Sequence, residues 1–179
     1  MSPQGVLSFW FEEIEPEAWW KSDPEFDALI ERRYGALLAQ GSQGELFEWR
    51  QDAHGRLAEI IVLDQFPRNI HRGTALAFAC DPMALALAQE AVAAGALAAL
   101  SAIERAFLLL PYMHSESRLI HQHAERLYKV HAPTENHEFE LKHKLIIDRF
   151  GRYPHRNAIL GRESTAEELE FLKQPGSSF

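Results

Sequence analysis

The chain has 179 residues, a length that matches one domain, and no stretch of it has the composition of a linker. Its 46% hydrophobic residues include 11 Phe and 4 Trp and supply enough apolar surface for a core that needs neither a disulfide nor a metal. The formal net charge of −8 argues against nucleic acid and anionic lipid as partners, because a field of that sign repels both.

The expected compartment is the cytoplasm. The single cysteine, Cys80, excludes an intramolecular disulfide, and its place in an apolar run predicts a packing role rather than a nucleophile. Residues 1–6 contain no basic segment of the kind that opens a secretory signal. The longest apolar region, 84–103, is interrupted by polar residues and glycine, so we expect no membrane span.

In the first half of the chain, helix signals recur and strand signals are nearly absent. Asp23, followed by proline, predicts an N-cap, and a helical stripe of apolar residues runs from it to Gly41. Asp81, again followed by proline, predicts a second such start. That helix is rich in small residues and is expected to stop at Gly95 in a left-handed C-cap.

The second half shows the same pattern. The N-caps predicted here are Ser101, Ser115, Thr134 and Thr165. The helix after Ser101 is apolar and is ended or kinked by Pro111, and the helix after Thr134 ends at Gly151. Residues 1–179 are therefore predicted to form one all-α domain of antiparallel helical hairpins, stacked as a bundle or as an α-solenoid.

Two segments, 63–70 and 149–162, each place an aromatic residue, a proline and then Arg-Asn after a helix. In a structural interpretation, Arg68 and Arg156 satisfy carbonyls at helix ends and pair with buried carboxylates such as Asp64. In a functional interpretation, the guanidinium groups form an anion site. The candidate ligand-binding residues are Asp64, Arg68, Asn69, His114, Glu116, Arg149, Arg152, His155, Arg156 and Asn157.

The segment 111–116 places a histidine, a hydroxyl and a carboxylate after a proline. His114 and Glu116 are two residues apart, which does not suit a metal site on a helix, and Ser115 lacks the flanking glycines of a nucleophile elbow. The remaining clustered histidines have no ligand spacing and are expected to be solvated on helix faces; they are His121, His123, His131, His137 and His143. We therefore expect no metal and no cofactor.

Several long and irregular motifs span nearly the whole chain. They are Phe9-Trp10-Phe11, Trp19 or Trp20, residues 63–69, Phe78 with Asp81, Pro111 with residues 114–116, residues 149–157, and residues 160–162 with Ser164-Thr165. In these motifs the chain closely resembles the bacterial domain-of-unknown-function family numbered 924. The resemblance implies an all-helical fold similar to tetratricopeptide-repeat proteins, and it implies no activity.

Three functions are compatible with these patterns. The first is a helical binding module whose polar, Arg-rich cleft accepts an anionic small molecule or peptide. The second is a hydrolase-type enzyme in which His114, Glu116 and His155 converge on one pocket beside the arginines. The third is a structural or assembly role with exposed aromatic anchors, for which the candidates are Trp10, Trp19, Trp20 and Trp49.

Overall fold

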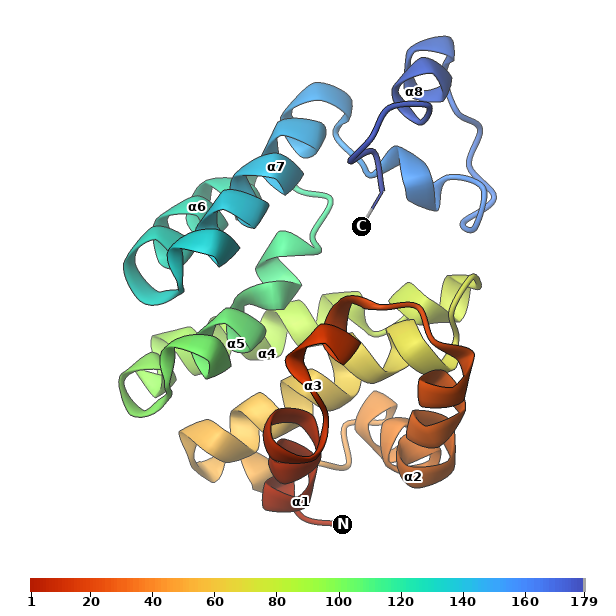
Figure 1. Ribbon diagram of the computed structural model, residues 1–179. Helices are drawn as coiled ribbons and strands as arrows, with labels where there is room; N and C mark the ends of the chain where they lie inside the picture. Colours follow the sequence, from red (N-terminus) through yellow and green to blue (C-terminus); the bar gives the residue numbers. More distant parts are fainter. Residues whose placement is uncertain (179) are drawn as a thin grey trace.

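The computed structural model describes residues 1–178, and every regular element in that range is a helix (Figure 1). The α-helices are α1 (Pro3–Ser8), α2 (Pro24–Ser42), α3 (Ala53–Ile70), α4 (Asp81–Ala93), α5 (Ala102–Met113), α6 (Arg118–His131), α7 (Thr134–Phe150) and α8 (Ala166–Phe171). A π-helical stretch, η1 (Phe9–Glu13), follows α1, and the 3-10 turns are η2 (Pro16–Trp20), η3 (Phe47–Gln51), η4 (Ala75–Phe78), η5 (Ala96–Ala99) and η6 (Pro154–Arg156). The prediction of an all-α fold is confirmed.

Consecutive helices from α2 to α7 pack against each other, which gives a series of antiparallel hairpins. Helix α3 lies at the centre and also contacts α1, α5 and several of the 3-10 turns. The segment after α7 carries η6 and α8 and returns beside the end of α7 (Figure 1). The finer expectation of a tetratricopeptide-like superhelix stays a prediction.

Most of the core is one large cluster of buried side chains contributed by residues 6–128. From Leu57 to Pro67, α3 is buried on every face, as expected for a helix surrounded by others. Aromatic rings of the first segment pack onto it. The Trp10 and Phe66 rings, for example, lie 5.8 Å apart in an edge arrangement. Trp10 is therefore a core residue, whereas Trp20 is 60% exposed and remains available as a surface aromatic.

A second and smaller cluster lies at the C-terminal end. Its buried members are Ile146, Ile147 and Tyr153, and Phe150 and Phe171 pack against them. This small apolar group anchors α8 and the preceding loop to α7. Polar contacts supply much of the remaining attachment.

Three of the predicted N-caps are confirmed by hydrogen bonds to the first helical turn. Asp23 caps α2, and its carboxylate accepts from the backbone N–H groups of Glu25 and Phe26. Ser101 and Thr165 each form a full capping box. The left-handed glycines expected at helix ends are also present, with φ of 77° at Gly95 and 70° at Gly151.

Three other N-cap predictions were wrong. Cys80 occupies the N-cap position of α4 and Asp81 is its first helical residue, because the Asp81 carboxylate is engaged by an arginine instead. Pro133 precedes α7, and Thr134 lies inside that helix. Ser117 rather than Ser115 caps α6, with its hydroxyl accepting from the N–H of Ile120 at 3.4 Å.

The stretch Ala75–Ala93 is long and apolar enough, by length and composition alone, to cross a membrane. It is divided here between η4 and α4, and α4 packs against both α3 and α5. Core helices of soluble proteins meet the same criterion.

Candidate functional site

Two helices run through a proline close to the predicted site. Pro67 lies inside α3 and Pro111 inside α5, and the two helices continue beyond these prolines, to Ile70 and to Met113. Arg68 and Asn69 are therefore part of the last turn of α3, which corrects the expectation that they follow the helix. A guanidinium N–H of Arg68 turns back along this turn and donates to the carbonyl oxygen of Asp64 at 2.6 Å.

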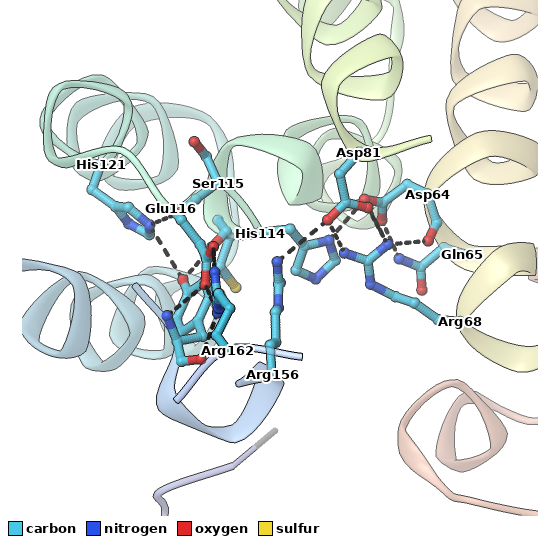
Figure 2. Close-up of polar contacts among 12 residues, drawn as sticks. Asp64, Gln65, Arg68, Asp81, His114, Ser115, Glu116, His121, Arg156 and Arg162 are labelled. Atoms are coloured by element: carbon cyan, nitrogen blue, oxygen red, sulfur yellow. Dashed lines mark hydrogen bonds and ion pairs between the residues drawn. The ribbon is translucent and has the colours of Figure 1, made fainter. Parts of the chain in front are cut away.

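Asp64 and His114 meet where α3 and α5 pack together (Figure 2). The Asp64 carboxylate is 1% exposed, and its Oδ1 lies 2.7 Å from Nδ1 of His114. The Gln65 amide donates to the other carboxylate oxygen, and Nη1 of Arg68 lies 3.5 Å from Oδ1. Burial alone would raise the pKa of Asp64, but Arg68 and His114 outweigh it and lower this pKa to about 2.

The proton on His114 can be placed from these contacts. Burial and the positive charge of Arg68 lower the pKa of His114, and they outweigh the opposing effect of Asp64. The imidazole is therefore neutral near pH 7, and its one proton is on Nδ1, which faces the charged carboxylate. The side chain remains 16% exposed.

Asp81 lies beside this pair and contacts two arginines (Figure 2). Arg68 holds both of its carboxylate oxygens, at 2.8 and 3.0 Å. Arg156, from η6, reaches Asp81 through a single longer contact of 3.4 Å. The Arg156 guanidinium carbon lies 4.5 Å from the Phe78 ring centroid and 4.7 Å from that of Tyr153.

Arg156 has few hydrogen-bond partners for a buried arginine. Its side chain is 8% exposed, and its buried Nε has no hydrogen-bond partner among the described residues. Burial and the neighbouring positive charge of Arg68 lower the pKa of Arg156. We call Asp64, Arg68, Asp81, His114 and Arg156 the Arg156 cluster.

Glu116 belongs to a separate, fully engaged ion pair. Arg162 donates to both of its oxygens, at 2.6 and 2.9 Å, and the backbone N–H of Tyr153 donates at 2.7 Å. Burial raises the pKa of Glu116, but these donors outweigh it and lower that pKa. Arg162 also bonds the side-chain oxygen of Asn157, whose amide donates to Ser164. These residues fasten the loop after η6 to the segment before α6.

His121 and His143 are buried, which corrects the expectation of solvated histidines. His121 is fully buried, with Nδ1 2.8 Å from Oε1 of Glu140 and Nε2 2.8 Å from the carbonyl oxygen of Ser115. The Tyr153 hydroxyl lies 3.2 Å from the same Nε2. His143 is 6% exposed, and burial lowers its pKa to about 3. Sequence spacing placed these residues on helices, but it could not show that neighbouring elements bury them.

The other predicted site residues lie elsewhere. Arg149 and Arg152 turn toward α8, where they pair with Glu167 and Glu168. The amide of Asn69 donates to Asp27 of α2 at 2.9 Å. His155 is near the ring of Tyr153, with centroids 5.6 Å apart, and burial lowers its pKa to about 4.

The predicted site residues thus separate into two kinds. Asp64, Arg68, His114 and Arg156 come together, whereas most of the others are paired in the C-terminal segment. Sequence reasoning missed Asp81 as a site residue, because an Asp before a proline was interpreted as a cap alone. The two repeated Arg-Asn segments could have indicated it, because their arginines, Arg68 and Arg156, both need a carboxylate partner.

Two hollows of the described surface lie away from this cluster. One hollow of about 500 Å³ is lined by Glu15, Glu17, Ala18, Lys21 and Asp23, and one of about 520 Å³ lies between α2, the end of α3 and η4. No set of three His, Cys, Asp or Glu side chains within residues 1–178 is placed to hold a metal ion.

Comparisons with known proteins agree with this fold. The family described as "Bacterial protein of unknown function (DUF924)" matches residues 6–176. The solved structure of a protein of unknown function from Agrobacterium tumefaciens, ATU0120, is similar, with a TM-score of 0.90 and 36% sequence identity over 96% of each chain. No curated protein matches the chain.

Proposed function

We propose that the chain, which belongs to the bacterial family of unknown function DUF924, binds a small anionic group at the Arg156 cluster. The family name supplies no activity, so the proposal is argued from the side chains of the cluster. The ligand class is a carboxylate or phosphate, carried by a small molecule or a peptide. No partner of nucleic acid or membrane type is proposed, and the protein is proposed to work in the cytoplasm.

The observation that carries this proposal is the incomplete pairing of Arg156. A guanidinium offers five N–H donors, and this one uses one of them in a 3.4 Å contact. The carboxylate that it reaches, Asp81, already accepts two shorter bonds from Arg68. A buried cation with so little compensation is costly, and an external anion offsets that cost.

The position of the cluster limits what can bind. Phe78 and Tyr153 hold the guanidinium between them, which fixes its plane without satisfying its donors. Neither of the hollows described above is lined by this cluster. The proposed binding mode therefore places only the anionic group of the ligand at the cluster and leaves the rest of the ligand on the surface.

The test is a melting-temperature titration with sodium phosphate and with succinate at constant ionic strength. A ligand that binds only the folded state at ten times its Kd stabilises by about 1.4 kcal/mol, which raises the Tm by about 3–6 °C for a chain of this size. Arg156→Met should abolish the shift, and it should itself change stability by only about 1 kcal/mol, since Met fills the space between the two rings.

Arg149→Met is the matched control. Arg149 pairs with Glu167 at an exposed position away from the cluster, so the anion-dependent shift should persist in this variant. A wild-type protein whose Tm responds to neither anion would remove the proposal. Equal anion-dependent Tm shifts in Arg156→Met and wild type would show that the anion binds at another site.

A second candidate is acid–base chemistry, and the Asp64–His114 contact favours it. A carboxylate that holds Nδ1 leaves the other ring nitrogen as a base. Glu116 does not contribute free carboxylate oxygens to such chemistry, because Arg162 and Tyr153 hold both of them. The hydrolase hypothesis therefore reduces to His114 with Asp64.

A further inference from the structure

We propose that the Arg156 cluster selects oxyanions that carry an O–H group of their own, such as hydrogen phosphate or a hydroxycarboxylate, over oxyanions that only accept hydrogen bonds. This inference rests on the proposed anion site and adds the ligand class. It follows from an accounting of donors and acceptors around His114.

Nε2 of His114 is a hydrogen-bond acceptor. Gln65 and Arg68 hold Asp64 in its charged form, so its Oδ1 accepts the Nδ1 proton of His114. With one proton on a neutral ring, Nε2 carries a lone pair and is an acceptor. The charged groups around this ring are Asp64, Arg68 and Asp81, and their combined effect with burial favours the neutral form.

This acceptor is open to solvent. No donor from the described residues forms a hydrogen bond to Nε2 of His114, and the side chain is partly exposed. In His121, by contrast, both ring nitrogens have partners within the protein. The lone pair of His114 is therefore open to a donor from outside the protein.

His114 and Arg156 belong to one network of contacts. Arg68 contacts Asp64 and Asp81, Arg156 contacts Asp81, and His114 contacts Asp64, so one network of contacts links the unsatisfied guanidinium to the open lone pair (Figure 2). The proposal places one oxyanion against both groups, where it accepts from Arg156. If this oxyanion also has an O–H, it donates to Nε2, whereas an oxyanion without one places oxygen against a lone pair.

Two matched ligand pairs test the inference by isothermal titration at about pH 8, above the ordinary pKa of histidine. Hydrogen phosphate and sulfate have the same shape and nearly the same charge there, and phosphate alone has an O–H. Malate and succinate differ in the same way. We expect about a tenfold preference for the member with the O–H, in the phosphate pair if the ligand is a phosphate and in the malate pair if it is a hydroxycarboxylate.

Two variants separate the role of Nε2 from mere structure. His114→Asn keeps a donor toward Asp64 but removes Nε2, so affinity should persist and the preference should fall to about one. Asp64→Asn should keep its oxygen toward the Gln65 donor and turn its amide N–H toward Nδ1. The His114 proton then moves to Nε2, and the preference should reverse toward sulfate or succinate.

Failure of the proposed O–H preference can be distinguished from failure of the proposed anion site. Binding of all four anions with equal affinity in wild type would overturn the inference and leave the anion site intact. A preference that survives in His114→Asn would also overturn it. Binding of none of the four would remove the proposed function as well. Circular dichroism of both variants should match wild type, and Arg156→Met should bind none of the four.

Discussion

At the scale of single residues, the buried contact between His121 and Glu140 fixes the position of a proton. Nε2 of His121 must donate, because it faces the carbonyl oxygen of Ser115. The Tyr153 hydroxyl donates to the carbonyl oxygen of Met113 and therefore faces His121 as an acceptor. Oε2 of Glu140 is buried without a partner among the described residues, which suits a neutral carboxylic acid better than a carboxylate.

Glu140 should therefore stay protonated above the pH at which a solvated glutamate ionises. Burial raises its pKa from the ordinary value of 4.5, even though His121 opposes this. A group with a raised pKa in the folded state contributes stability at low pH and loses it as the pH rises through that pKa. Between pH 4.5 and 7, wild type should lose stability relative to Glu140→Gln, whose amide can donate to Nδ1 at every pH.

Urea denaturation of the two proteins across that range measures the difference directly. At pH 7, Glu140→Gln should be at least as stable as wild type, while Glu140→Ala should be less stable by about 1–3 kcal/mol, because it leaves Nδ1 of His121 unsatisfied. A Glu140→Gln protein that is strongly destabilised at pH 7 would show instead that the pair is a carboxylate and an imidazolium.

At the scale of elements, sequence reasoning located helices well and their ends less well. Asp23 and Ser101 were found because a cap is a local interaction, decided within a few residues. Asp81 was misassigned because a partner 13 residues away, Arg68, binds its carboxylate. His121 was misassigned because its burial depends on a neighbouring helix. Local residue spacing does not show which distant segments pack together, and both errors arose there.

Gly55 is a further residue whose role only packing shows. A Cβ placed on it would lie 1.9 Å from the carbonyl oxygen of Trp49, so the start of α3 must approach η3 through a glycine. Gly55→Ala should cost about 3 kcal/mol or more, since backbone has to move. Gly35→Ala in α2 is the control, because its Cβ would meet only the Glu31 side chain at 3.9 Å. That change should stabilise by about 0.4–1 kcal/mol, and chemical denaturation measures both.

At the scale of the whole molecule, the chain has a large N-terminal core and a small C-terminal one. The larger cluster includes residues from Val6 to Tyr128. The C-terminal segment depends instead on a few apolar contacts and on partly buried ion pairs, among them Arg156–Asp81, Glu116–Arg162 and Arg152–Glu168. Regions with few buried apolar contacts open at lower free energy than the core.

Glu116→Gln should therefore loosen the C-terminal segment selectively. Loss of one charged partner costs about 1.5–3 kcal/mol, which corresponds to about a tenfold or greater acceleration of amide hydrogen exchange in η6 and α8. Exchange in α3 should not change. Glu170→Gln breaks an exposed pair with Lys173 and should leave both regions unchanged. Uniform acceleration across the chain would mean that the segment unfolds only with the core.

The contacts that build the Arg156 cluster span long stretches of chain: 50 residues separate Asp64 from His114, and 75 separate Asp81 from Arg156. A polypeptide grows from its N-terminus, and domains begin to fold in that order during synthesis. The residues of the larger core have thus all been made before Arg156 is added to the chain. Until then Asp81 has Arg68 as its only arginine partner in the cluster, so a chain that stops early has most of the architecture and none of the unsatisfied cation. Under the proposed function, an anion is captured only once Arg156, in the last quarter of the chain, has been synthesised.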